Sequence, residues 1–310
     1  MTEFTYGGEI VWRPTPEHIE HANLTKFMRR HGIRNFDELM QKSTSDVAWF
    51  TDAVLGFLDI RFYEPYSKVV DLSEGIQFPK WCVGGKMNIV HNCVDKWTSV
   101  EGGKQKAVVF EGEEGGTRTI TYEELYKEVN KAANALRSLG LGKGDAVGIF
   151  MPMTPEIVIA LLAIAKIGGI ILPLFSGYGA GAIVSRMADA EAKALFASDG
   201  AFRRGKAVEM KSIADEAAEQ IPTLKHMIVL KRTGQTINMK AERDHWWHEL
   251  VDAQSDDAGT EITVADHLYI RHDGQTERRT AHALRISRQS RTGYGVRDGR
   301  PRWGCHLLDD

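Results

Sequence analysis

DAVGIFMPMTPEIVIALLAIAKIGGIILPLF, Asp145–Phe175, places two short apolar runs on either side of a longer one. The flanking runs have the length of strands, and the central run has the length of a helix that begins after Thr154 with proline at its first position. Lys166, two glycines and a proline interrupt the apolar residues of 157–175, so this stretch does not read as a membrane span. The segment predicts a buried strand, a helix and a second buried strand, which is the repeating unit of a parallel sheet.

The same alternation of strands and helices continues on both sides of this segment. Thr121 and Glu124 form a capping box that opens an expected helix, and Gly140 stands where a left-handed residue ends one. The apolar runs are continuous, as in strands that are covered on both faces. The predicted fold class is therefore α/β, a parallel sheet with helices on both faces, which binds ligands at the carboxyl ends of its strands. Strands are expected at 106–113, 145–151, 169–175, 192–198 and 226–230, a returning strand within 113–121, and helices at 122–139, 155–167, 179–190, 211–221 and 244–254.

Residues 1–104 do not share this regular pattern. Short helices are expected within 15–33 and 35–57. The segment FPKWCVGGKMNIVHNCVDKW, Phe78–Trp97, is rich in aromatic residues, glycine and asparagine, and an ordered loop with a short helix is expected there. We interpret 1–104 as an irregular, mostly helical N-terminal extension that packs on a larger domain.

Composition limits the classes of function that need to be considered. The 310 residues are 43% hydrophobic and carry a formal net charge of −3, so the chain as a whole is not expected to bind nucleic acid. The three cysteines show no pairing pattern and no metal-ligand spacing, and no metal site is predicted. The N-terminus lacks a basic region followed by an apolar one. A cytoplasmic protein without a membrane partner is expected.

The end of the chain differs from everything before it. Nine arginines occur from Arg271 to Arg302, whereas the last lysine is Lys240. Residues 271–310 also contain five acidic residues and are therefore at +4, which leaves the first 270 residues at −7. No hydrophobic period is visible in this tail. We treat 267–310 as a separate, aberrant Arg-rich segment that is expected to be disordered.

Three stretches together resemble one protein family. Thr119–Gly200 is similar to the opening of the AMP-forming acyl-CoA synthetases, members of the adenylate-forming superfamily. WCVGGKMNIVHNCVDKW, Trp81–Trp97, resembles the N-terminal extension of the acetyl-CoA synthetase branch, and FRRGK, Phe202–Lys206, matches a basic segment of that branch. The resemblance covers roughly residues 10–265. It implies that 1–104 is that extension and that 105–266 is the first part of the AMP-binding adenylation domain.

The resemblance also implies an activity and a set of binding residues. The intact family uses ATP, CoA and Mg²⁺ to join a carboxylate to CoA, releasing AMP and pyrophosphate, and the branch favours a short acid such as acetate. Ser176, Gly177, Arg203 and Lys206 match family positions that contact CoA. The family often has glycine where this chain has Ser176, and the added hydroxymethyl group either crowds CoA or donates to it. Without the resemblance, the two cations would be interpreted as a solvated basic loop.

One motif of the family is missing from the chain. A phosphate loop of the type TSGTTGKPKG is expected soon after EITVAD, Glu261–Asp266, but HLYIRHDGQTERRTAHAL stands there. The codons for Gly274–Arg279, shifted by one base, can encode GKPKG, and from His272 they can encode TTGKPKG. We therefore interpret the tail as an out-of-frame translation of the missing motif. No catalytic residue is assigned, and the 310-residue chain is expected to be an inactive fragment of an acid–thiol ligase.

An alternative reading remains open at this stage. The chain is then a non-catalytic remnant that binds CoA through its basic segment, or RNA through the Arg-rich tail. SRQSRTGYGVRDGRPRW, Ser287–Trp303, has the composition of an RNA-binding tail.

Overall fold

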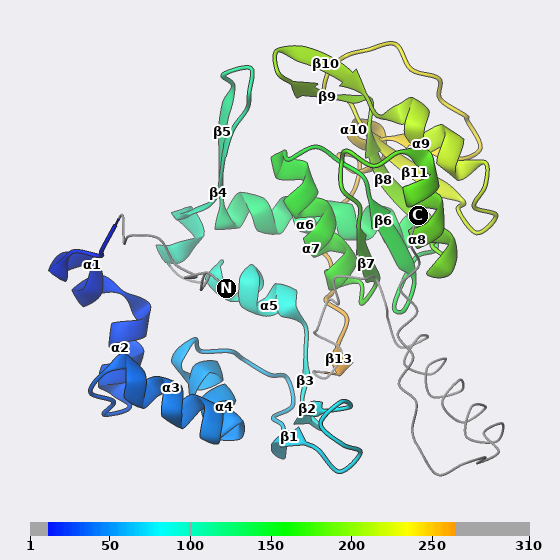
Figure 1. The fold of residues 1–310 in the computed structure, drawn as a ribbon. Helices are drawn as coiled ribbons and strands as arrows, with labels where there is room; N and C mark the ends of the chain where they lie inside the picture. Colours follow the sequence, from blue (N-terminus) through cyan, green and yellow to red (C-terminus); the bar gives the residue numbers. More distant parts are fainter. Residues whose placement is uncertain (1–11, 99–100, 265–310) are drawn as a thin grey trace, which may run out of the picture. The chain divides into compact units, whose positions relative to one another are not determined.

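The computed structural model describes residues 12–98 and 101–264, so the aberrant tail of 267–310 lies outside the described residues. Contacts divide the chain into two compact units. Among the described residues, one unit holds those up to Lys104 together with 260–264, and the other holds Gln105–Gly259. Figure 1 labels most elements of each unit.

The second unit is built on one five-stranded sheet in which every neighbouring pair is parallel. The order across the sheet is β12-β11-β8-β6-β7. Gly148 lies opposite Leu172 on one side and Leu195 on the other, which fixes the register of the three strands around it. The strands are β6 (Ala146–Ile149), β7 (Ile170–Pro173), β8 (Ala194–Ser198), β11 (His226–Leu230) and β12 (Asp244–Trp246).

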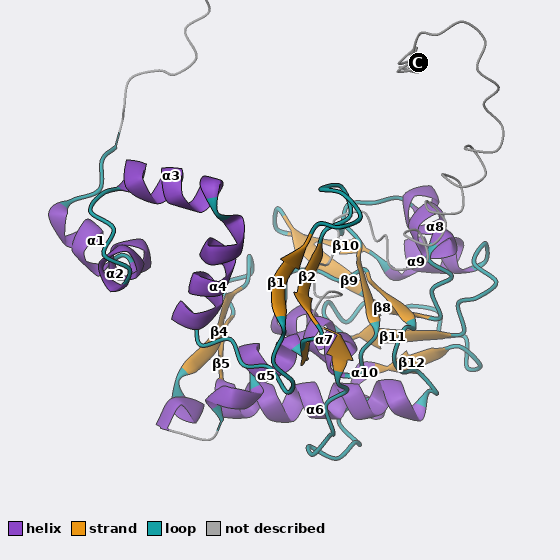
Figure 2. Cartoon of the chain, turned by 90° about the horizontal axis from the view of Figure 1, so that it is seen from below, coloured by secondary structure: helices purple, strands orange, loops and turns teal. Residues whose placement is uncertain are grey.

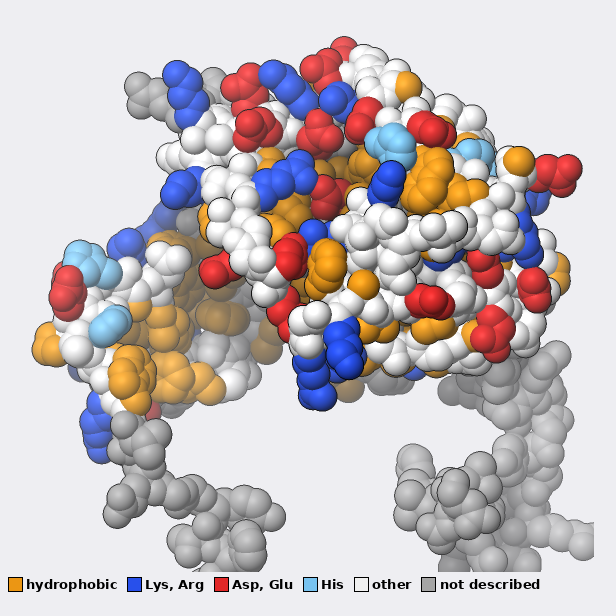
Figure 3. All heavy atoms as spheres, turned by 90° about the horizontal axis from the view of Figure 1, so that it is seen from above, with side chains coloured by type: hydrophobic (Ala, Val, Ile, Leu, Met, Phe, Trp, Pro, Cys, Tyr) orange, Lys and Arg blue, Asp and Glu red, His pale blue; other side chains and the backbone are white. Residues whose placement is uncertain are grey.

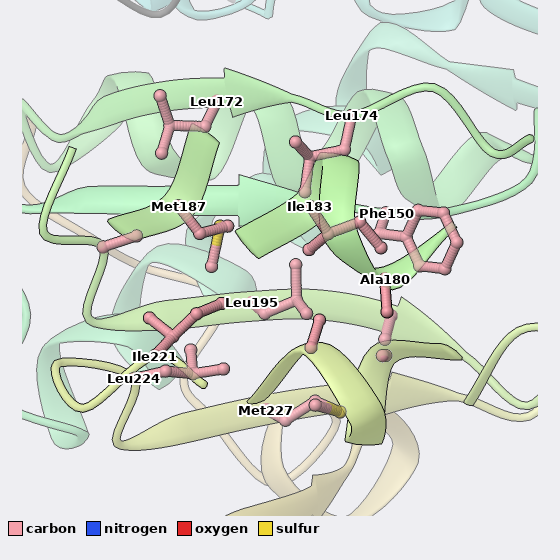
Figure 4. Packing of buried hydrophobic residues seen from close by; sticks show 14 of the residues in the cluster. Phe150, Leu172, Leu174, Ala180, Ile183, Met187, Leu195, Ile221, Leu224 and Met227 are labelled. Carbon is pink, nitrogen blue, oxygen red and sulfur yellow. The ribbon is translucent and has the colours of Figure 1, made fainter. Parts of the chain in front are cut away.

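Helices cover both faces of this sheet, which confirms the predicted fold class (Figures 1 and 2). On one face the ring of Phe196 lies 5.6 Å from that of Trp247 in α10. On the other face Leu195 and Met227 pack against Ile183 and other residues of the opposite helices (Figure 4). The first face carries α6 (Tyr122–Ser138), α7 (Pro155–Lys166) and α10 (Trp247–Leu250), and the second carries α8 (Ala180–Asp189) and α9 (Lys211–Ala218).

Glycine at position 148 lets α8 lie directly on the sheet. A Cβ atom there would stand 2.8 Å from Cδ1 of Leu195 and 3.1 Å from Cε of Met187, and closer still to the sulfur of Met187. Met187 and Leu195 are both fully buried, so neither has open space to move into. The tight crossing of α8 over β6 therefore depends on the missing side chain (Figure 4).

The signals that bound α6 in the sequence are confirmed. The hydroxyl of Thr121 accepts from the backbone N–H of Glu124 at 3.3 Å, and the carboxylate of Glu124 accepts from the N–H of Thr121 at 2.8 Å. Gly140, just past the helix, has a φ of +78°. Thr154 does stand at the N-cap of α7, but its buried hydroxyl makes no hydrogen bond to a described residue.

Three strands of the second unit were absent from the sequence-based expectations. A hairpin of β9 (Gly200–Arg203) and β10 (Lys206–Glu209) follows β8, where only a basic segment was expected. The helix predicted over 244–254 is wrong in its first part, because residues 244–246 pair with β11 as strand β12. The hairpin of β4 (Lys106–Glu111) and β5 (Thr117–Thr121) agrees with the expected strand, turn and returning strand.

The first unit is mainly helical and has a small aromatic core. The ring of Phe27 lies 5.4 Å from that of Phe57 and 5.9 Å from that of Phe50, both nearly edge-on. The side-chain amide of Asn88 donates to the carbonyl of Glu261 at 2.9 Å, where the chain returns to this unit. Its elements are α1 (Pro16–His21), α2 (Asn23–Arg30), α3 (Phe36–Ser45), α4 (Val47–Phe57), β1 (Lys68–Asp71), β2 (Lys80–Val83), β3 (Lys86–Met87), α5 (Ile89–Cys93), η1 (Asp95–Trp97), η2 (Glu101–Lys104) and β13 (Thr263–Val264).

The helices of 12–98 and 101–264 include none that combines the length and the apolar character needed to cross a bilayer.

Candidate functional site

The candidate site lies at the carboxyl ends of β7, β8 and β11 in the second unit. Three loops begin there: the turn after β7, the β9–β10 hairpin after β8, and the segment 231–235 after β11. Strands β8 and β11 are neighbours, whereas β6 separates β8 from β7. All four residues predicted to contact CoA lie on the first two of these loops, at the edge of the sheet where parallel α/β folds bind ligands.

The first loop is a tight turn over Phe175–Tyr178. The N–H of Tyr178 donates to the carbonyl of Phe175 at 2.9 Å, and Ser176 and Gly177 occupy the two central, exposed positions. A Cβ atom at Gly177 would stand 2.6 Å from the ring of Phe175, so a side chain there would displace that ring. The turn therefore presents a hydroxyl and open backbone toward solvent.

The second loop presents three exposed cations, Arg203, Arg204 and Lys206, of which the first and the last are the predicted ones. Arg203 and Lys206 face each other across the end of the β9–β10 hairpin, and the two residues between them, Arg204 and Gly205, have φ values of +52° and +74°. Positive φ at both positions is typical of the two-residue turn that suits the twist of a hairpin. Arg203 and Lys206 are both exposed, and neither forms an ion pair with a residue that the structure describes. Both charges are thus available to an anionic ligand.

A buried carboxylate joins the second loop to the third. Asp199, which connects β8 to the hairpin, is fully buried. Its two oxygens accept hydrogen bonds of 2.7–3.1 Å from the backbone N–H groups of Arg232, Thr233 and Gly234. A carboxylate with this many donors is well compensated for its burial. Asp199 therefore holds the segment after β11 against the base of the hairpin.

The side chain of Arg232 extends this connection to a third part of the unit. Its guanidinium lies 5.1 Å from the ring centre of Phe202, in the hairpin, and 5.6 Å from that of Phe110, in β4. It also forms an ion pair with Glu114, in the turn between β4 and β5. The hydrogen bond from Arg232 lowers the pKa of Glu114 from its ordinary value. Arg232 thus links the two hairpins of this unit.

Asp199 and Arg232 were not among the residues that the sequence singled out. One signal for Asp199 was present, because an acidic residue directly after the buried run ALFAS marks the carboxyl end of a strand. A second signal was the short polar segment KRTGQ, Lys231–Gln235, after the run HMIVL. Neither signal predicts that the two segments contact each other, because that depends on β8 and β11 being neighbours.

A buried ionic network joins the start of α9 to the start of β12. The ammonium of Lys211 is 2.7 Å from a carboxylate oxygen of Asp215, 2.8 Å from one of Asp244, and donates to the carbonyl of Asn238 at 3.0 Å. Arg243 bonds both carboxylates. Two cations and two anions cancel, so the network has a structural role. A pocket of about 150 Å³ borders it, lined in part by Asp199.

The other pocket lies on the face covered by α6, α7 and α10. Its volume is about 480 Å³, and its charged lining is largely paired: Arg118 with Glu156, and Lys131 with Glu128 at 3.0 Å. Across 12–98 and 101–264, no three His, Cys, Asp or Glu side chains converge as metal ligands. Figure 3 shows basic and acidic side chains interspersed on the face in view, with hydrophobic ones between them. On this face, anion binding therefore depends on local cations rather than on a broad positive patch.

Comparison with known proteins finds relatives for both units of the chain. Residues 96–270 match the family described as AMP-binding enzyme, and 36–93 match the family described as acetyl-coenzyme A synthetase N-terminus. The acetyl-coenzyme A synthetase of Methanothrix thermoacetophila is 39% identical over 261 residues, which cover 83% of this chain and 39% of that protein. The acetyl-coenzyme A synthetase of Streptomyces coelicolor is 44% identical over 200 residues, covering 64% of this chain and 31% of that protein.

A solved structure shows the same arrangement of elements. The acetoacetyl-CoA synthetase from Streptomyces lividans superposes with a TM-score of 0.72 at 25% sequence identity, and the match covers 83% of this chain and 40% of that one. The chain spans about two fifths of the length of the first of these relatives and of the solved structure. The chain belongs to the AMP-binding enzyme family, and it corresponds to the N-terminal part of an AMP-forming synthetase.

Proposed function

We propose that this chain belongs to an AMP-forming acyl-CoA ligase of the acetyl-CoA synthetase branch. The observation that carries the proposal is the match to acetyl-coenzyme A synthetases through both the N-terminal region and the second unit, Gln105–Gly259, which we call the sheet unit. The substrates are a short-chain acid, with acetate favoured, together with ATP, Mg²⁺ and CoA. We place the reaction in the cytoplasm, where ATP and CoA are available.

Four residues at the carboxyl edge of the sheet are proposed to contact CoA. Arg203 donates two hydrogen bonds to one phosphate, and Lys206 acts as a point charge beside it. Ser176 and Gly177 contact the nucleotide part of CoA at the turn after β7. The exposure of Arg203 and Lys206, and the absence of an ion pair to any described residue, support this role.

Replacing both cations tests the proposal directly. The Arg203→Ala, Lys206→Ala double variant is expected to raise the Kd for CoA at least about a hundredfold, because two charge-assisted contacts are lost and each stabilises the complex by about 1.5 kcal/mol or more. Calorimetric titration of the 310-residue chain at low and high salt measures this change. A Lys26→Ala, Arg30→Ala double variant removes one lysine and one arginine of α2 that are exposed and form no ion pair with a described residue, and it serves as the matched control. An equal loss of CoA affinity in both variants would mean that only the net charge of the chain matters.

The 310-residue chain is proposed not to catalyse the reaction. Its cations at the sheet edge bind and orient phosphates, but no residue of 12–98 or 101–264 is assigned to the chemistry at the triphosphate. We expect no AMP above background from acetate, ATP, Mg²⁺ and CoA, measured by chromatography. AMP formation that requires both the acid and CoA would contradict this, whereas CoA binding without AMP formation supports it.

The Arg-rich tail is proposed to be an out-of-frame translation of the family's phosphate loop. In support, the match to the AMP-binding enzyme family ends at residue 270, close to the expected frame change. Resequencing the gene from the codon for Glu261 onward tests this. Additional bases near codons 269–273, followed by an open frame, support the proposal. An unchanged sequence favours the remnant reading, and RNA binding that is lost on deletion of 268–310 and weakens with salt then identifies the tail as its cause.

A further inference from the structure

We propose that Arg232 is a positioning residue, which holds the β9–β10 hairpin so that Arg203 and Lys206 meet the phosphates of CoA together. The proposal rests on the proposed function for the identity of the ligand. It concerns a residue outside the predicted contact set, on a different loop, which acts through the ring of Phe202. Three features of the hairpin carry it.

The hairpin needs a support of this kind. Among the described residues, β9 and β10 pair only with each other, so no third strand fixes their tip. All four residues of β10 are exposed, and so is Arg203 in β9. Ala201 of β9 packs against the core, but β10 does not, and a two-stranded ribbon with so little hydrophobic packing is marginally stable. The orientation of the cations at its tip therefore depends on contacts made elsewhere along the hairpin.

The base of the hairpin is fixed by buried polar groups. The hydroxyl of Ser198 donates to the carbonyl of Gly200 at 2.8 Å, and the carboxylate of Asp199 is held by the three N–H groups of 232–234. A Cβ atom at Gly200 would stand 2.7 Å from the carbonyl oxygen of Val208 and 2.9 Å from the hydroxyl of Thr233. The start of β9 thus has little freedom, and it lies beside the segment that carries Arg232.

The next fixed point along β9 is Phe202, one residue before Arg203. Its ring faces the guanidinium of Arg232, which also lies over the ring of Phe110. Contacts between guanidinium groups and aromatic faces stabilise by roughly 0.5–2 kcal/mol, depending on how dry they are. Because the side chain of Arg232 is only 22% exposed, this contact is partly protected from water. Arg232 therefore limits how far the second half of β9 moves.

The charge of Arg232 is already used. Its ion pair with Glu114 ties it to the turn of the β4–β5 hairpin. Its three side-chain partners, Phe202, Phe110 and Glu114, thus all belong to other segments of the unit. This leaves the exposed cations of the hairpin tip, Arg203, Arg204 and Lys206, to face the ligand, with Arg232 acting on them through Phe202. The substitution Phe202→Leu, which changes no charge, therefore distinguishes the two roles. If Arg232 positions the hairpin, Phe202→Leu raises the Kd for CoA, and if Arg232 binds the phosphate directly, the Kd stays normal.

The experiment compares three substitutions in the full 310-residue chain by titration with CoA. Arg232→Ala and Phe202→Leu are each expected to raise the Kd for CoA about fivefold, which corresponds to the loss of one contact of this type. Val109→Ala, on the exposed side of β4, is the matched control and leaves the Kd unchanged. In the Arg203→Ala, Lys206→Ala background, Arg232→Ala has no further effect if it acts only by positioning. A normal Kd in Phe202→Leu with an additive loss in Arg232→Ala overturns the proposal.

A second measurement keeps this proposal separate from the proposed function. Amide hydrogen exchange without ligand is expected to accelerate several-fold at 201–208 in Arg232→Ala and Phe202→Leu, with no change in β6. If the unmodified chain does not bind CoA, the proposed function fails, but faster exchange still supports positioning of the hairpin by Arg232. Unchanged exchange in both variants overturns the positioning role, whether or not CoA binds.

Discussion

Asp244→Asn is expected to lower the free energy of unfolding of the sheet unit by about 3 kcal/mol, because removing one member of a buried ion pair leaves its partners uncompensated. The carboxylate of Asp244 and the ammonium of Lys211 are almost completely inaccessible to water, because their side chains are 0% and 1% exposed. An amide at 244 would turn N–H donors toward the donors of Lys211 and Arg243. Urea unfolding of the full chain measures the loss, and hydrogen exchange of β11 amides assigns it to this unit.

The matched control for this substitution is Asp257→Asn, at an exposed position whose carboxylate makes no ion pair within the described residues. It is expected to change stability by less than about 0.5 kcal/mol. A similarly small change for Asp244→Asn would show that the amide and the surrounding cations rearrange without penalty. That result would contradict the role we assign to the network.

The same substitution has a defined dependence on pH. Burial alone would raise the pKa of the Asp244 carboxyl, but hydrogen bonds from Arg243, Lys211 and the N–H of Lys240 outweigh it, and the pKa lies below its ordinary value of 3.8. A carboxylate whose folded-state pKa is lowered contributes its full stabilisation above the unfolded value and loses it as the pH falls through the folded value. The difference in free energy of unfolding between the parent chain and Asp244→Asn is therefore expected to be constant near neutral pH and to shrink below about pH 4.

Gly148→Val is expected to destabilise the sheet unit by about 3 kcal/mol or more, because a side chain at this position meets Met187 and Leu195 in a fully packed core. Urea unfolding gives the magnitude. Gly181→Ala in α8 is the control. A Cβ atom at this position has no neighbour within 4 Å, and the substitution replaces a helical glycine with a better helix former. We expect the control to be neutral or slightly stabilising.

A double-mutant cycle identifies the cause of the Gly148 effect. Gly148→Ala and Met187→Ala are each expected to lower the free energy of unfolding by about 2–3 kcal/mol. Gly148→Ala does so by overpacking the core, and Met187→Ala does so by leaving a cavity. Together they are expected to cost at least about 1 kcal/mol less than the sum, because the new methyl group occupies space vacated by the sulfur. Additive losses would mean that the position requires glycine for its backbone rather than for the approach of α8.

The parts of the fold that were predictable from the sequence are those whose signal is local. Asp145–Phe175 forms the expected strand, helix and strand, because central parallel strands are apolar on both faces and so differ clearly from their surroundings. Thr121 and Gly140 bound α6 through contacts within a few residues of themselves. Such features do not depend on which strands become neighbours.

The parts that were missed depend on contacts between distant segments. Residues 244–246 have a sequence compatible with a helix, and they become a strand because β11 offers them an edge. The β9–β10 hairpin is largely exposed, so it lacks an apolar alternation that periodicity would detect. Of the candidate site, the sequence indicated only the two loops that carry the proposed CoA contacts, since Asp199 and Arg232 act across the pairing of β8 with β11.

The pairing of β13 with β3 has a consequence for the order in which the protein forms on the ribosome. Thr263 pairs with Met87, so the two strands of this ladder are separated in the chain by the whole of the sheet unit. During synthesis, β3 is available long before its partner has left the exit tunnel, whereas every strand of the five-stranded sheet precedes β13. Pairing between such distant segments is slow to form. The β3–β13 ladder therefore forms only after every strand of the five-stranded sheet has been synthesised, so the N-terminal unit is completed last.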